Sequence, residues 1–132
     1  MTAGDRPRPS PQTIFMVNRR DNPVATFDES TFTGDWTWIE APPDWTPEDG
    51  LEEAAPGTTA ILVFSRRHRE KQIRRQCEHI RSVLEDIPLL VAVTQYEMPL
   101  ANRVKELRKT DYVFSPIEEN DLVERLDRLQ QP

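Results

Sequence analysis

The sequence predicts an α/β domain in which buried parallel strands are joined by helices that cover both faces of one sheet. Three short apolar runs contain β-branched or aromatic residues without polar interruption, at residues 13–17 (TIFMV), 59–64 (TAILVF) and 89–93 (LLVAV). Such runs are typical of strands buried on both faces. Helical patterns occur between the later runs, and strands that alternate with crossover helices favour a parallel sheet. A chain of 132 residues suffices for one such core but not for two.

The first half of the chain has weak helical signals. Residues 1–12 contain three prolines, two arginines and no apolar periodicity, so we expect a disordered arm before a single domain over residues 13–132. Residues 36–40 (WTWIE) alternate like a strand, and residues 46–54 (TPEDGLEEA) have the composition of a short acidic helix. Residues 22–34 lack a good helical period, so the first crossover helix is expected to be short, distorted or missing.

The second half gives clearer helices. An amphipathic helix is predicted over residues 67–85, where apolar residues recur every three or four positions, at Ile73, Cys77, Ile80 and Leu84. Two further helices are marked by apolar residues at Leu100, Val104 and Leu107 and at Leu122, Val123, Leu126 and Leu129. Residues 112–114 (YVF) lie between them as a fifth strand. These elements predict a flavodoxin-like, doubly wound sheet of five parallel strands.

Composition narrows the classes of function. Cys77 is the single cysteine, so the chain has no intrachain disulfide or cysteine-based zinc site, and a reducing cytoplasm is expected. His68 and His79 do not have the spacing of metal ligands, and we expect no metal or cofactor. The apolar runs are too short to span a bilayer, and the first residues lack the apolar core of a signal peptide. We therefore expect a soluble, unexported protein without a membrane partner.

The usual signatures of an enzyme are missing from the sequence. It contains only four glycines and has no Gly-rich phosphate loop. It also lacks a Gly-x-Ser-x-Gly motif and any Cys-His or carboxylate pair at an evident catalytic spacing. The sequence therefore predicts a protein that is not an enzyme.

Polar residues follow the ends of the three later strands. Ser65 ends AILVFS, Thr94 ends LVAVT, and Ser115 follows the aromatic Tyr112 in DYVFSP. In this order and spacing, the chain from about residue 13 onward resembles a receiver domain of two-component response regulators. The resemblance implies that Ser65 stands in place of the phosphate-accepting aspartate and Thr94 in place of the hydroxyl residue that bonds the phosphoryl group. It also implies that Tyr112 is the switch aromatic and that Ser115 replaces the family's lysine.

Departures from the family pattern decide the predicted chemistry. A receiver forms an acyl phosphate on a carboxylate, assisted by Mg²⁺ that further carboxylates hold. The family's acidic pair falls on Asn18 and Arg19, with Asp21 only a few residues beyond, and Ser65 cannot form an acyl phosphate. The resemblance therefore implies a pseudo-receiver, a receiver-like domain that cannot be phosphorylated. Such a domain would act in signal transduction as a protein–protein interaction or dimerisation module, with a signalling protein or a second copy as its partner.

Two residues of this pattern have more than one interpretation. Residues 115–118 (SPIE) are typical of a capped helix start with proline in the first turn, and this capping role is favoured for Ser115. Alternatively, Ser115 lines a remnant pocket with Ser65 and Thr94, a cluster of neutral hydroxyls that can hold an anion or water. For Tyr112, packing is favoured over switching, because aromatic residues in short strands usually belong to the core.

Charge is strongly segregated along the chain, although the formal net charge is only −6. Residues 21–65 contain ten acidic residues and no Lys or Arg, whereas residues 66–81 contain seven Lys or Arg and two Glu. Candidate partner-binding residues are therefore Arg66, Arg67, Arg69, Lys71, Arg74 and Arg75. A solvated helix face is the simplest explanation of this pattern, and an acidic protein partner is the second. Polyanion or nucleic-acid binding through helix 67–85 is the alternative function, disfavoured by the overall acidity and the lack of interleaved aromatic residues.

Overall fold

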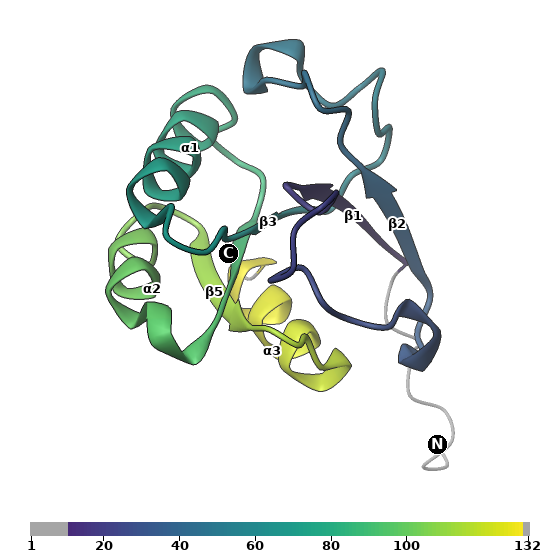
Figure 1. Ribbon diagram of the computed structural model, residues 1–132. Coiled ribbons are helices and arrows are strands. Elements are labelled where there is room, and N and C mark those ends of the chain that lie inside the picture. The colour runs from purple at the N-terminus through teal and green to yellow at the C-terminus, as the bar shows by residue number, and fades with distance from the viewer. Residues whose placement is uncertain (1–10, 131–132) are drawn as a thin grey trace.

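Five parallel strands form one sheet in the computed structural model, which describes residues 11–130 (Figure 1). The strands are β1 (Gln12–Val17), β2 (Trp36–Glu40), β3 (Ala60–Phe64), β4 (Leu89–Val93) and β5 (Thr110–Phe114). Their order across the sheet is β2-β1-β3-β4-β5. This arrangement confirms the predicted flavodoxin-like α/β class. The predicted arm over residues 1–12 lies mostly outside the described residues, and Gln12 already belongs to β1.

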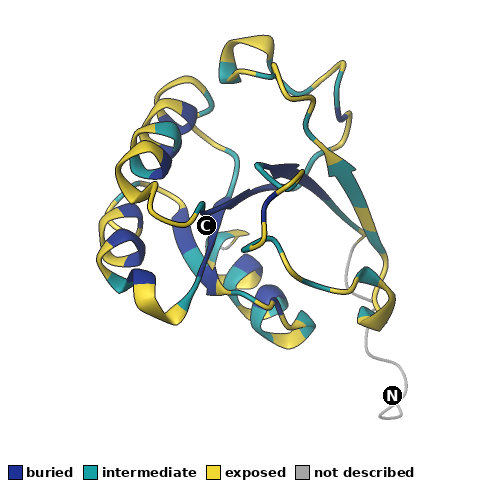
Figure 2. Ribbon diagram, viewed as in Figure 1, coloured by how far each residue is buried: buried dark blue, intermediate teal, exposed yellow. Residues whose placement is uncertain are grey.

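The three uninterrupted apolar runs form the centre of the sheet, as predicted. Every residue of β3 and β4 is buried, and so are the last four residues of β1 (Figure 2). Alternate side chains of these strands enter two separate apolar clusters, one on each face of the sheet. Both faces are covered, which explains why these strands lack the polar alternation of a half-exposed sheet.

Three helices cover the sheet. Helices α1 (Glu70–Val83) and α2 (Met98–Val104) pack on one face, and α3 (Glu119–Gln130) packs on the other. Helix α1 begins three residues later than the predicted range 67–85 because residues 66–69 form a turn, in which His68 has a φ of 63°. None of the helices in residues 11–130 is long and apolar enough to cross a membrane.

The connections on either side of β2 contain no α-helix among the described residues. They contain only the short 3₁₀ turns η1 (Glu29–Thr31) and η2 (Pro47–Asp49). The expectation of a short or missing first crossover helix is confirmed, whereas the expected acidic helix over residues 46–54 is wrong. The helical segment that starts at Pro47 ends after one turn, because the N–H of Gly50 donates to the carbonyl of Pro47 and Gly50 has a φ of 71°.

An aromatic cluster lies where the first crossover helix would be. Its members belong to the β1–β2 connection and to β2, and they are Phe27, Phe32, Trp36 and Trp38. The rings of Trp36 and Trp38 stack with centroids 5.3 Å apart, and Phe27 lies 4.9 Å from Trp38. Phe27 also stacks on Phe64 of β3 at 6.0 Å. These side chains cover the face of the sheet beside α3, so aromatic packing replaces a helix there.

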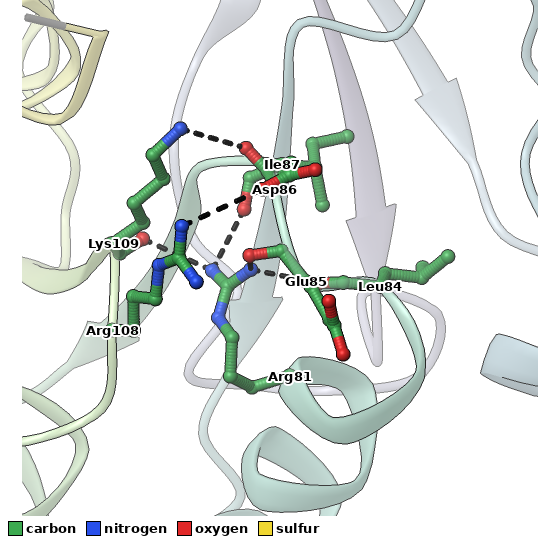
Figure 3. A network of polar contacts seen from close by, with 7 residues as sticks. All are labelled: Arg81, Leu84, Glu85, Asp86, Ile87, Arg108 and Lys109. Atoms are coloured by element: carbon green, nitrogen blue, oxygen red, sulfur yellow. Dashed lines mark hydrogen bonds and ion pairs between the residues drawn. The ribbon is translucent and has the colours of Figure 1, made fainter. Parts of the chain in front are cut away.

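Arg81 joins the end of α1 to the starts of β4 and β5 (Figure 3). Its buried guanidinium donates hydrogen bonds of 2.7–3.0 Å to the carbonyl oxygens of Leu84, Glu85, Ile87 and Lys109. Burial, and to a lesser extent the nearby Arg108, lowers the pKa of Arg81. One of the seven basic residues in 66–81 is therefore used inside the fold and is not part of a binding surface.

Candidate functional site

The residues picked out by the family resemblance gather at the carboxyl ends of neighbouring strands. Asn18, Ser65, Thr94 and Ser115 directly follow β1, β3, β4 and β5. In doubly wound sheets, ligands bind at these ends, close to the point where the strand order reverses. That point lies here between β1 and β3. The position of the candidate site therefore agrees with the general rule for this architecture.

Ser65 and Thr94 converge on a carboxylate that the sequence analysis did not select, that of Glu97. The Oε1 atom of Glu97 accepts hydrogen bonds from Ser65 Oγ at 2.8 Å, from Thr94 N at 2.8 Å and from Thr94 Oγ1 at 3.0 Å. Glu97 is only 5% exposed and Ser65 is fully buried. The expected cluster of neutral hydroxyls is therefore an acidic site. Residues 94–97 (TQYE) match the capping-box pattern, and this signal could have identified Glu97 from the sequence.

The positions of the family's acidic pair hold the β1–β2 connection in place. Asn18 has a φ of 67° and donates hydrogen bonds from Nδ2 to Gln76 Oε1 at 2.7 Å and to the carbonyl of Phe64 at 3.2 Å. Arg19 forms an ion pair with Glu29, and its guanidinium lies 4.6 Å from the centroid of the Phe27 ring. Neither side chain forms a hydrogen bond with Ser65. Both positions are therefore occupied by structural contacts.

Asn22 is a second residue that the sequence analysis missed. Its side chain is buried and donates to the carbonyl oxygens of Asn18 and Ser65, both at 2.8 Å, while its Oδ1 accepts from the N–H of Val24. Asn22 thereby fixes the β1–β2 connection to the end of β3. An asparagine in a loop gives no sequence signal for such a long-range role.

Ser115 does not cap the final helix, so that prediction is wrong. Helix α3 begins at Glu119, and the Ser115 hydroxyl instead donates to the carbonyl of Val24 at 2.6 Å. The Ser115–Pro116 peptide bond is cis. Through this hydrogen bond, the residue that follows β5 holds the β1–β2 connection at Val24.

Tyr112 is partly buried against the core on the face that α1 and α2 cover. The Arg125 guanidinium lies 4.8 Å from the centroid of its ring, and the Phe114 ring lies 5.5 Å away. These contacts agree with the packing interpretation.

A cavity of about 480 Å³ opens beside Glu97, between the loops that follow β1, β3, β4 and β5. Thr94 and Ser115 line it together with Glu97, whereas the buried Ser65 does not. The remaining lining residues are Pro23, Val24, Thr26, Arg67, His68, Glu70 and Tyr96. The cavity therefore combines an acidic wall, an apolar wall and a charged rim.

The candidate partner-binding residues separate into two groups. Arg67, Arg69, Lys71 and Arg75 are exposed and form no ion pair with any residue in 11–130. Arg66 and Arg74 are partly buried. Arg66 lines a second cavity, of about 470 Å³, with Arg19 and Arg20, and Arg74 Nε lies 3.9 Å from Glu78 Oε1. The basic surface is therefore formed by the first group, at the start and on the outer side of α1.

Comparison with known proteins identifies the fold. No protein-family model matches the chain, and no curated protein matches it at a significant level. Among solved structures, it is similar to a CheY-like protein (TadZ) from Pseudomonas aeruginosa PAO1. The TM-score is 0.65 and the sequence identity is 10%, over 92% of this chain and 96% of that chain. The chain thus has a CheY-like fold, the fold of receiver domains, and at this identity the similarity extends to the fold alone.

Proposed function

We propose that the chain is a receiver-like module that cannot accept phosphate and that acts in signal transduction by binding another protein or a second copy of itself. One observation carries the proposal: the Ser65 hydroxyl, at the acceptor position, is fully buried and donates to the Glu97 carboxylate at 2.8 Å. Serine cannot form an acyl phosphate. A phosphoryl group on Ser65 would also lie next to a buried carboxylate of the same charge sign.

The surroundings of β1 also support the loss of phosphoryl transfer. That chemistry in a receiver relies on Mg²⁺, which prefers several oxygen ligands including carboxylates. Asn18 and Arg19 are engaged with Gln76 and Glu29, and Asp21 is exposed and forms no hydrogen bond or ion pair with a described residue. Within residues 11–130, no three His, Cys, Asp or Glu side chains group closely enough to hold a metal ion.

Phosphorylation by a small-molecule donor tests the first half of the proposal. The purified chain is incubated with acetyl phosphate and Mg²⁺ and its intact mass is measured, beside a Ser65→Ala variant. We expect unchanged masses for both proteins. A magnesium-dependent phosphoryl adduct on the wild type that is absent from Ser65→Ala would overturn the proposal.

Salt and charge reversal test the second half. If Arg67 and Arg75 face an acidic surface on a partner or a second copy, the double change Arg67→Glu with Arg75→Glu should weaken association, and so should added salt. The control is Arg103→Glu with Lys105→Glu, which makes the same change of charge at the C-terminal end of α2. Sedimentation of the chain alone and with its captured partner supplies the measurement. Association that responds to neither salt nor reversal assigns the basic residues to a solvated face.

Polyanion binding is kept as a second candidate because Arg19, Arg20 and Arg66 line one cavity, and Arg66 directly precedes Arg67 of the basic surface. Binding of polyphosphate or duplex DNA is measured at several salt concentrations. If several basic residues bind the polyanion, the logarithm of the binding constant should fall steeply and linearly with the logarithm of the salt concentration. The absence of binding at low salt would exclude this alternative.

A further inference from the structure

We infer that the cavity beside Glu97 binds an organic cation with N–H donors, a guanidinium or an ammonium group. Glu97 is buried, with only 5% of the residue exposed. Its Oε1 atom accepts three hydrogen bonds, whereas its Oε2 atom is buried and has no hydrogen-bond partner. No Lys, Arg or His among residues 11–130 forms an ion pair with it.

A buried carboxylate in this condition requires an explanation. Charged groups inside proteins are normally paired or fully hydrogen-bonded, because desolvation otherwise costs several kcal/mol. Arg67 and His68 line the same cavity, but both are exposed and neither donates to Glu97. A donor from outside the described residues would complete the hydrogen bonding of this carboxylate, and the cavity that Glu97 lines offers it a route.

The other walls of the cavity define the chemistry of the ligand. Arg67 and Glu70 at the rim compensate each other in formal charge, so Glu97 supplies the excess negative charge when His68 is neutral. Pro23, Val24 and Tyr96 offer apolar surface for methylene or methyl groups. Tyr96 is 84% exposed, and its ring can also attract a cation. A guanidinium suits such a site because it presents several N–H donors in one plane and sheds water more readily than an ammonium.

This inference does not rest on the proposed function, because it concerns a carboxylate and a cavity and not the acceptor chemistry of Ser65. The same cationic group could belong to a free small molecule or to an arginine side chain of a protein partner. Both would place N–H donors against Glu97 Oε2. The experiment therefore has one arm for each source.

The first arm is a titration of the ¹⁵N-labelled chain with methylguanidinium chloride, followed by NMR. Tetramethylammonium chloride at equal ionic strength is the control ligand, because it has the same charge but no N–H donor. We expect saturable shifts at the amides of Thr94, Tyr96 and Glu97 with methylguanidinium only. Equal shifts with both salts, or no saturable shift near the cavity, would overturn the inference.

Variants locate the site. Glu97→Gln keeps an oxygen that accepts from Ser65 and Thr94 but removes the charge. We expect this variant to bind methylguanidinium more weakly, by about tenfold or more. Glu70→Gln removes an exposed carboxylate from the same cavity and is expected to keep most of the affinity. Unchanged binding by Glu97→Gln contradicts the inference. If that variant does not fold, Tyr96→Ala supplies the test, with an expected loss of about threefold, and no loss is then the contradicting result.

The second arm separates the two sources. The peptide Gly-Arg-Gly is compared with Gly-citrulline-Gly, in which the side chain is of similar size but uncharged. Binding of the arginine peptide at least as tightly as methylguanidinium, with none for the citrulline peptide, supports an arginine side chain of a partner. Binding of methylguanidinium without the peptide supports a small free cation. Equal binding of both peptides would overturn the requirement for a cation.

Discussion

The two halves of the sheet are covered in different ways (Figure 2). From β3 onward, each connection contains a helix, and α1, α2 and α3 bury the strands. Around β2 the connections contain only 3₁₀ turns, and aromatic side chains cover β1 and β3. Each aromatic residue can bury about 150–250 Å², so a few of them replace a helix as cover. A buried strand thus requires apolar contact on its face, which need not come from a helix.

The two halves also differ in how their backbone N–H and C=O groups are hydrogen-bonded. A helix supplies its own hydrogen bonds, whereas an irregular connection depends on individual side chains. Glu119 at the start of α3 accepts from the N–H groups of Thr33 and Gly34 and from the indole of Trp36. Asn22 and Ser115 hold other parts of the β1–β2 connection. The non-helical half is therefore fixed by few side chains, and two of these, Ser115 and Glu119, belong to the helical half.

The largest effect is expected in the helical half, at Arg81. Arg81→Met keeps an apolar stem but leaves buried carbonyl oxygens without their donor, and should lower the free energy of unfolding by about 3 kcal/mol. Urea denaturation measures the loss. Arg75→Met on the exposed side of α1 is the matched control and should change stability by about 0.5 kcal/mol or less. Equal effects of the two changes would mean that the Arg81 network adds no stability to this half.

The sequence predicted the helical half better than the other for a physical reason. Apolar spacing in α1 and the apolar runs of β3 and β4 are local signals, and the structure confirms these elements. The stacking of Phe27 on Phe64 is a contact between distant segments and leaves no period in the sequence. The turn at His68, which delays α1, is also set by a single backbone conformation that propensity does not indicate.

The candidate site was predictable to a similar extent. The spacing of Ser65 and Thr94 placed both at the carboxyl edge of the sheet, where the structure has them. This spacing did not indicate that the Glu97 carboxylate would accept hydrogen bonds from both residues. Only the local TQYE pattern points to Glu97. Ser115 had the pattern of a cap, but a tertiary hydrogen bond to Val24 overrides it.

The second effect tests whether the aromatic cluster is a true part of the core. Phe27→Ala removes contacts with Phe32, Trp38 and Phe64 and should cost about 2 kcal/mol, less than a fully buried phenylalanine because Phe27 is partly exposed. Phe114→Ala at the exposed end of β5 is the control, with an expected loss of about 0.5 kcal/mol or less. Equal losses would contradict the role of aromatic packing as a replacement for a helix.

The reactivity of Cys77 shows whether the loss of stability in Phe27→Ala extends to the helical half. The thiol is buried under α1, and burial raises its pKa to about 12, so alkylating reagents should react only after the helical half opens. If both halves unfold together, a loss of about 2 kcal/mol in Phe27→Ala should speed labelling about thirtyfold. Labelling at the wild-type rate would show that the non-helical half opens alone.

The smallest effect is expected for the carboxylate that joins the two halves, Glu119. Its partial burial opposes ionisation, but hydrogen bonds from the N–H groups of Thr33 and Gly34 and from the Trp36 indole outweigh that effect and lower its pKa. An unfolded glutamate has a pKa of about 4.3, so the contribution to stability is complete above that pH and is lost as the pH falls through the lower folded value. Glu119→Gln should therefore cost about 1 kcal/mol or less at neutral pH, because the group is partly solvated.

The difference between wild type and Glu119→Gln should shrink below about pH 4. Urea denaturation of both proteins at several pH values measures it. Glu118→Gln is the control, since Glu118 is an exposed neighbour whose carboxylate forms no hydrogen bond with residues 11–130. A difference that stays constant with pH would show that the neutral side chain holds the loop equally well. The contact between residue 119 and the β1–β2 connection would then depend on the shape of the side chain, and the charge of Glu119 would not stabilise it.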